Sequence, residues 1–172
     1  DMMTAIDYRY SDNAFTVYVD AFQTRVTLNM RELAVLVPAL NVVVLERIVD
    51  SSDKVLKQSP EPQGMKDCIT SLREIAEAPW KELLEKLIVF DRVLQTDPAG
   101  AYPRMDFDSR EVYRNIVAAY AEHSDCSEIE IAELAIKLAR ESQKQHYTDQ
   151  RLALRKSHVG YYLVAEGAEE LQ

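Results

Sequence analysis

The sequence predicts an all-α fold, an antiparallel bundle of about six to seven helices without a sheet. In most segments apolar residues recur at intervals of three and four, the spacing of one helical face. With only four glycines and six prolines in 172 residues, the chain has little material for the many tight turns of an all-β protein. Its length also lies within the single-domain range, so we expect one domain over residues 1–172.

The first half of the chain predicts two helices. Phe15, Val19 and Phe22 share one face of a short helix over residues 12–24. Asn29 followed by Glu32 has the form of a capping box, which opens a second helix. Because apolar residues cover nearly all faces of this second helix, we expect it to be central, with a kink or break at Pro38.

A polar segment follows this helix. Residues 51–64 read SSDKVLKQSPEPQG and contain Pro60, Pro62 and Gly64, which are typical of irregular backbone. We therefore predict a flexible linker over about 51–64.

Four further helices and a less regular tail are expected after the linker. One helix runs from Met65 to about Glu77, and Pro79 lies in the first turn of the next, whose apolar stripe is Leu83, Leu87, Phe90 and Leu94. Capping-box patterns at Asp108 with Glu111 and at Ser127 with Glu130 open helices to about residues 124 and 143. The tail predicts a helix through Arg155 and a break near Gly160.

Charge and cysteine content exclude several classes of protein. A formal net charge of −9 argues against nucleic-acid binding and against docking on an anionic membrane surface. The most apolar stretch, residues 33–45, is shorter than the roughly 20 residues that cross a bilayer. Cys68 and Cys126 form no pairing pattern, which favours a reducing compartment. The opening residues lack the features of a secretory signal, and we expect a fragment of a longer protein.

The residues predict neither a metal site nor a cofactor. His123, His146 and His158 have no carboxylate or cysteine partner at helical spacing, and no glycine-rich loop could hold a phosphate. Asp106 and Asp108 could in principle serve glycoside hydrolysis. We instead expect Asp108 to cap a helix and Asp106 to be a solvated loop residue.

The segment 96–107 is the loop of greatest interest. Arg104 and Arg110 flank its acids and could hold it by charge-assisted hydrogen bonds to Asp97, Asp106 or Asp108. Tyr102 lies between small residues and a proline, where a phenol is either a buried anchor or a group presented to a partner. We favour the anchor.

Five segments carry a family resemblance. Residues 97–114, DPAGAYPRMDFDSREVYR, resemble a motif of the cyclic β-1,2-glucan synthases, in which DPAG-x-Y-x-RMDF leads into a helix. Residues 156–167, KSHVGYYLVAEG, resemble the HVGYYL segment of the same family. Three further stretches, 19–33, 69–80 and 127–139, are similar to other family segments in the same order. The resemblance covers most of the chain from about residue 19.

The resemblance implies a place in a large bacterial enzyme. Such synthases polymerise glucose from UDP-glucose with a membrane-embedded transferase domain and a phosphorylase-like domain, and neither is present in this sequence. The chain is therefore expected to be a helical region on the cytoplasmic face of the inner membrane. Its expected partners are the transferase and phosphorylase-like domains, with β-1,2-glucan as a further candidate.

Three functional hypotheses remain open at this point. The first is a scaffold domain without catalytic residues. The second is a carrier that presents a tyrosine acceptor for the growing glucan, with Tyr102 first and Tyr161 or Tyr162 next, because the family builds its glucan on the protein and a phenol is a competent nucleophile. The third is a helical interaction module of an unrelated soluble regulator.

Overall fold

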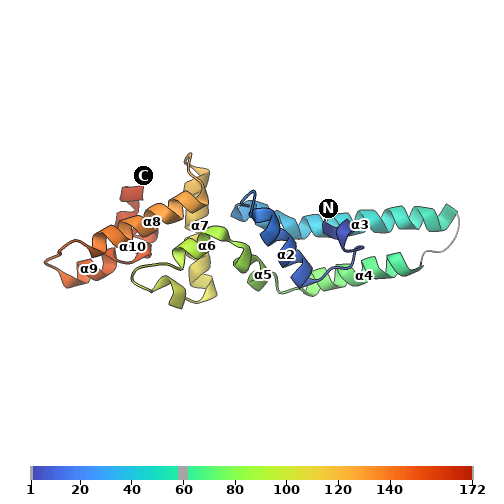
Figure 1. The fold of residues 1–172 in the computed structure, drawn as a ribbon, viewed down its shortest axis with the longest axis horizontal. Helices are drawn as coiled ribbons and strands as arrows, with labels where there is room; N and C mark the ends of the chain where they lie inside the picture. The colour runs from blue at the N-terminus through green and yellow to red at the C-terminus, as the bar shows by residue number, and fades with distance from the viewer. Residues whose placement is uncertain (1, 58–61, 172) are drawn as a thin grey trace. The chain divides into compact units, whose positions relative to one another are not determined.

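The computed structural model describes residues 2–57 and 62–171, and side chains over 2–52 and 64–169. In this part of the chain the secondary structure consists of ten α-helices and two short 3-10 helices, without a strand (Figure 1). The all-α prediction is therefore confirmed. The helix number exceeds the expected six to seven because α1 (Met2–Ala5) and α10 (Val159–Val164) are too short to produce a clear period, and because α6 (Val89–Leu94) is separated from the helix after Pro79. The helix α9 (Gln150–Lys156) is the one expected through Arg155.

The chain divides into two compact units, Asp1–Leu87 and Ile88–Gln172. The first holds α1, α2 (Asp12–Gln23), α3 (Met30–Lys57), α4 (Pro62–Glu77) and α5 (Trp80–Leu87). The second holds α6, η1 (Tyr102–Arg104), α7 (Phe107–Glu122), α8 (Glu128–Gln143), α9, α10 and η2 (Glu166–Leu171). The expectation of one domain stays a prediction.

The capping box at the start of α3 is present, but the helix is not central. The Asn29 backbone N–H donates to Glu32 Oε2 over 2.8 Å, and the Glu32 N–H donates to Asn29 Oδ1 over 2.9 Å. The helix runs through Pro38 without a break. It buries one stripe, which includes Leu33, Leu40 and Val44, whereas four apolar residues on another face are exposed. An apolar composition all round thus does not place this helix in the middle of its unit.

Part of the segment predicted as a flexible linker is helical in the described residues, and its flexibility stays a prediction. Residues 51–57 continue α3 and residues 62–64 begin α4, while residues 58–61 lie outside the described residues. Pro62 is at the first position of its helix, where its missing N–H costs no hydrogen bond. Helices α3 and α4 pack side by side (Figure 1), so tertiary contacts support helical structure in a polar sequence.

The predicted amphipathic helix after Pro79 is divided in two. Ile88 has extended backbone with φ −72° and ψ 103°, so α5 ends at Leu87 and α6 begins at Val89. The apolar stripe is nevertheless buried on both sides of the break, at Leu83, Leu87, Phe90 and Leu94. The break coincides with the boundary between the two units.

The first unit has an aromatic core. The Phe15 ring meets the Trp80 ring edge to face with centroids 5.2 Å apart, and Tyr10 lies 5.8 Å from Trp80. The indole Nε1 of Trp80 donates to the Ile75 carbonyl over 2.7 Å. These contacts fix the turn before α2 against the end of α4. Phe22, which the sequence placed on the same face as Phe15, is exposed.

The second unit is built on α8. Its capping box of Ser127 and Glu130 is present as predicted. The helix buries a face rich in small residues, which lets α6 approach closely; its buried members are Ile131, Ala132, Ala135, Ile136, Ala139 and Ser142. In the tail the break falls at Ser157 and His158, whereas Gly160 lies inside α10. Within the described residues no helix is long and apolar enough to cross a membrane.

Candidate functional site

The two most specific motif segments meet in the second unit, and Asp97 joins them. Its Oδ2 accepts the backbone N–H groups of Ala101 and Tyr102 over 2.9 and 3.1 Å. Its Oδ1 accepts the N–H of Val159, the first residue of α10, over 3.0 Å. One buried carboxylate therefore closes the 97–102 turn and also satisfies a backbone donor at the start of the HVGYYL helix.

Tyr102 is a buried anchor, with no exposed surface. Its hydroxyl donates to Asp91 Oδ1 over 2.5 Å, and Arg114 Nε donates to the same oxygen over 2.7 Å. Gln95 Nε2 donates to the other oxygen, Oδ2, over 3.0 Å. Asp91 and Arg114 are 7% and 1% exposed, so α6, η1 and α7 are connected through a desolvated ion pair.

The protonation of this centre follows from its contacts. Burial alone would raise the pKa of Asp91, but hydrogen bonds from Arg114, Tyr102 and Gln95 outweigh it and hold the pKa below its usual value. Burial, together with the hydrogen bond to the Asp91 carboxylate, raises the pKa of Tyr102 far above its ordinary value. The resting state is a carboxylate, a guanidinium and a neutral phenol.

This arrangement is suited to holding structure rather than to chemistry. A general base or nucleophile must reach a substrate. Tyr102, Asp91 and Arg114 are buried, and the Tyr102 hydroxyl and the Arg114 Nε both bond to Asp91. A neutral phenol with a raised pKa is also a weak nucleophile. The cluster therefore links secondary structure elements at the base of the motif loop.

The loop arginine and the acids of the motif have local roles. Arg104 Nε donates to the Gly100 carbonyl over 2.6 Å, so it holds the loop through backbone oxygens rather than through the expected acids. Asp106, and not Asp108, caps α7: its Oδ1 accepts the Ser109 N–H over 2.8 Å. The hydrogen bonds from Ser109 lower the pKa of Asp106.

The cap prediction was therefore wrong by two residues. Asp108 lies in the first turn of α7, where a carboxylate suits the positive end of the helix dipole. Arg110 is half-buried in the same helix. Asp97, Arg104 and Asp106 do gather at one loop, as the motif implied, but each contacts backbone.

The other two candidate acceptors are also buried. Tyr161 and Tyr162 lie in α10, with ring centroids 5.2 Å apart in an edge-to-face arrangement. The cations of Arg155 and Lys156 lie over the Tyr161 ring at 5.9 and 5.4 Å from its centroid. In this structure Tyr102, Tyr161 and Tyr162 all belong to the core of the second unit.

Two central residues were not selected from the sequence. Asp91 lies four residues after Leu87 and three before Leu94, on the apolar stripe itself. A carboxylate on a buried stripe must be paired with a buried hydrogen-bond donor. The position of Asp91 on the stripe could therefore have identified it as a central residue. Arg114 belongs to the quoted motif, but its partner lies 23 residues earlier and no local pattern connects them.

Gly160 allows a close approach of α10 to α7. A Cβ at this position would overlap the Tyr113 hydroxyl and lie 2.7 Å from Cε1 of His158, whose ring caps α10. We expect Gly160→Ala to lower the free energy of unfolding by about 1–3 kcal/mol, the usual effect of overpacking. Urea denaturation of the variant and of the parent chain measures this change in the free energy of unfolding.

Gly64→Ala is the matched control for Gly160→Ala. A Cβ at Gly64, in α4, would meet nothing within 4 Å. Alanine has the higher helix propensity, so this variant should gain up to about 1 kcal/mol. Equal stability of the Gly160→Ala variant and the parent chain would contradict the packing described.

The described residues contain no group of three or more His, Cys, Asp or Glu side chains arranged to hold a metal ion.

Comparison with known proteins gives one partial relative. A segment of 102 residues, 59% of the chain, is 31% identical to the cyclic beta-(1,2)-glucan synthase NdvB of Rhizobium meliloti (strain 1021). The match covers 4% of that protein, so the chain spans only a small part of its length. No family model and no solved structure matches the chain. The similarity suggests a distant relation to a segment of a glucan synthase.

Proposed function

We propose that this chain is a non-catalytic helical scaffold domain of a large synthase that makes cyclic β-1,2-glucan from UDP-glucose. The parent enzyme would be a membrane-associated glycosyltransferase, with this domain on the cytoplasmic face of the bacterial inner membrane. The partners of the domain would be the transferase and phosphorylase-like parts of the same protein.

One observation carries the scaffold role: the residues that resemble the family motifs build a core. Asp97 and Tyr102 of the first motif hold the loop to α6 and to α10, and α10 contains most of the second motif. A supporting domain needs residues that hold its own fold together rather than residues that act on a substrate. The use of these motif residues in the core therefore favours a scaffold. The partial similarity to a glucan synthase supports the choice of parent enzyme.

An exposed apolar stripe on α3 supports docking on other domains. Val35, Val42, Leu45 and Val49 are 50–63% exposed and follow one another at intervals of seven, three and four residues. This spacing places them on one helical face, in the pattern that helices use to pack on one another. Such a contiguous apolar face is typical of a contact surface.

The carrier hypothesis remains a proposal that the burial of the three tyrosines weighs against. Sugar transfer to Tyr102 would require the second unit to open and the phenol to leave Asp91. The same core location applies to Tyr161 and Tyr162. A scaffold needs no such opening.

Intact mass spectrometry of the full-length parent protein after UDP-glucose turnover separates the two roles. For a scaffold, hexose attachment is expected to persist in folded Tyr102→Phe, Tyr161→Phe and Tyr162→Phe variants. Loss of attachment in one folded variant would establish the carrier instead. The isolated chain should release no UDP from UDP-glucose, and catalytic release would overturn the non-catalytic assignment.

A further inference from the structure

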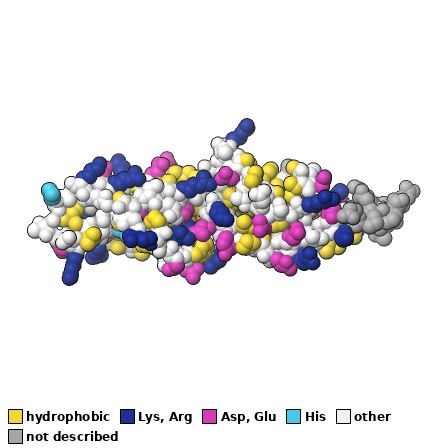
Figure 2. Space-filling view, turned by 60° about the horizontal axis from the view of Figure 1, so that its bottom comes forward, with side chains coloured by type: hydrophobic (Ala, Val, Ile, Leu, Met, Phe, Trp, Pro, Cys, Tyr) yellow, Lys and Arg dark blue, Asp and Glu magenta, His cyan; other side chains and the backbone are white. Residues whose placement is uncertain are grey.

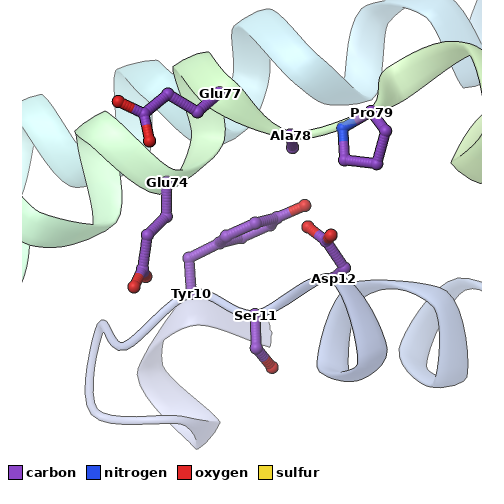
Figure 3. A pocket seen from close by; sticks show the side chains of 7 residues that line it. All are labelled: Tyr10, Ser11, Asp12, Glu74, Glu77, Ala78 and Pro79. Carbon is purple, nitrogen blue, oxygen red and sulfur yellow. The ribbon is translucent and has the colours of Figure 1, made fainter.

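A small acidic pocket in the first unit has no role in the proposed scaffold. It has a volume of about 300 Å³ and lies between the start of α2 and the junction of α4 with α5 (Figure 3). This volume is at the low end for ligand sites and suits one side chain or a small molecule rather than a large cofactor. All of its lining residues belong to the same unit.

The pocket contains a buried hydroxyl that lacks a well-formed hydrogen bond. Tyr10 is 4% exposed, and its hydroxyl makes no hydrogen bond of ordinary geometry. Figure 3 shows this hydroxyl pointing toward Asp12 and Pro79, which both line the pocket. A buried phenol whose hydrogen bond is poorly formed costs free energy, which a ligand that bonds to it would recover.

The Tyr10 side chain is firmly held in this position. Its backbone N–H donates to Ser71 Oγ over 2.8 Å, and the Ser71 hydroxyl donates to the Tyr8 carbonyl over 2.6 Å. Asp7 and Tyr8 just before it have φ values of 50° and 58°, a left-handed conformation that is costly for residues with a side chain. The neighbouring Trp80 and Phe15 rings fix the phenol ring.

The charge of the pocket selects a cation. Its lining includes the carboxylates of Asp12, Glu74 and Glu77, and among the described lining residues there is no Lys or Arg. None of the three carboxylates forms an ion pair with a described residue. Burial, the interaction of the hydroxyl with the Asp12 carboxylate and the negative charges of Asp12 and Glu74 raise the pKa of Tyr10. The phenol therefore stays neutral, and its oxygen can accept a hydrogen bond from a cation.

The geometry favours a guanidinium over a metal ion. These carboxylates do not belong to any group arranged to hold a metal in the described part of the chain. A guanidinium spreads five N–H donors over a plane, so it can bond to acceptors that do not converge on one point. Pro79 and Ala78 supply apolar surface beside the carboxylates, against which such a weakly hydrated cation can lie.

We propose that this pocket binds a guanidinium group of the kind that an arginine side chain carries. Asp12 accepts hydrogen bonds from the bound group, the Tyr10 hydroxyl contacts it, and Glu74 and Glu77 on α4 add negative charge at the entrance. The source is either an arginine of another polypeptide segment or a free guanidinium compound. The proposal does not depend on the glucan synthase assignment.

Titration of the chain with N-acetyl-arginine amide tests the site. The fluorescence of Trp80, the one tryptophan in the sequence, serves as the signal because its ring lies next to Tyr10. We expect saturable binding that weakens with added salt. N-acetyl-citrulline amide has nearly the same shape without the charge and should bind at least about tenfold more weakly.

Methylguanidinium chloride distinguishes the two sources. Binding as tight as that of N-acetyl-arginine amide supports a free compound, and weaker binding supports an arginine side chain with its stem. Both results support the proposed site, because in each case the charged probe binds to it. Equal binding of the citrulline and arginine probes, or preference for a neutral β-1,2-linked glucose disaccharide, would overturn the proposal.

Variants locate the binding in the pocket. Asp12→Asn and Tyr10→Phe should each weaken arginine-probe binding, by about tenfold for Asp12→Asn. Glu133→Gln is the matched control, because it removes one exposed charge from α8 in the second unit. If folded Asp12→Asn and Glu133→Gln proteins bind the probe equally, the pocket is not the site. Should Asp12→Asn fail to fold, Glu77→Gln provides the same comparison on α4.

Discussion

Replacing Asp91 by alanine is expected to lower the free energy of unfolding of the second unit by about 3–5 kcal/mol. The carboxylate accepts bonds from Tyr102, Arg114 and Gln95, and its removal leaves a buried guanidinium and a buried phenol without their partner. Loss of one member of a buried ion pair costs more than the pair contributes, because the remaining charge is desolvated and unpaired. Urea denaturation monitored by circular dichroism measures the change.

A second substitution separates two contributions to this loss of stability, the buried charge left on Arg114 and the packing lost with the Asp91 side chain. Replacing Arg114 by methionine in the Asp91→Ala background removes the unpaired charge, so the double variant should be more stable than Asp91→Ala alone. Because the folded state lowers the pKa of Asp91, its contribution is present at neutral pH and is lost as the pH falls through that lowered pKa. This acid loss should be absent from the double variant. An Asp91→Ala protein as stable as the parent chain would contradict the structural role of the centre.

The second large effect is expected at Asp97. Its two carboxylate oxygens accept three backbone N–H groups, from Ala101, Tyr102 and Val159. Alanine would leave these donors unsatisfied at a buried position, at about 1–3 kcal/mol for each donor that water cannot reach. We therefore expect a loss of about 3 kcal/mol or more in the free energy of unfolding, measured by the same denaturation.

Two controls accompany Asp97→Ala. Asp97→Asn keeps one oxygen acceptor and should recover part of the loss. Asp125→Ala removes an exposed carboxylate from the loop between α7 and α8, where we expect a change within about 0.5 kcal/mol. If Asp97→Ala and Asp125→Ala are equally stable, Asp97 does not hold the two motif segments together.

The helices were predictable from the sequence wherever a local signal defined them. The capping boxes at Asn29 and Ser127 correctly mark the starts of α3 and α8, because a cap is satisfied within three residues. The break at Ile88 and the helical structure of residues 51–57 were missed. In both cases the outcome depends on contacts with distant parts of the same unit rather than on local preference.

The candidate site could be predicted only in part, because its central contacts also join residues that are far apart in the sequence. Tyr102 was favoured as an anchor and is one, since a phenol between small residues and a proline fits an interior position. Its partner Asp91 lies 11 residues earlier, and the pairing of Asp91 with Arg114 spans 23 residues. The exposed apolar face of α3 could not be predicted either. The sequence predicted a central helix, whereas four apolar residues on α3 are exposed. Figure 2 shows hydrophobic side chains on one face of the molecular surface.

Tyrosine nitration of the folded chain tests most directly whether the motif tyrosines are anchors. Tetranitromethane reacts with accessible phenolates, and peptide mass spectrometry assigns each modified ring. The structure predicts that Tyr18, which is 43% exposed on α2, is modified readily, whereas Tyr102 and Tyr162 are protected until urea unfolds the chain. Nitration of Tyr102 in the folded chain as fast as that of Tyr18 would contradict the account, since the phenol would then be presented rather than buried against Asp91.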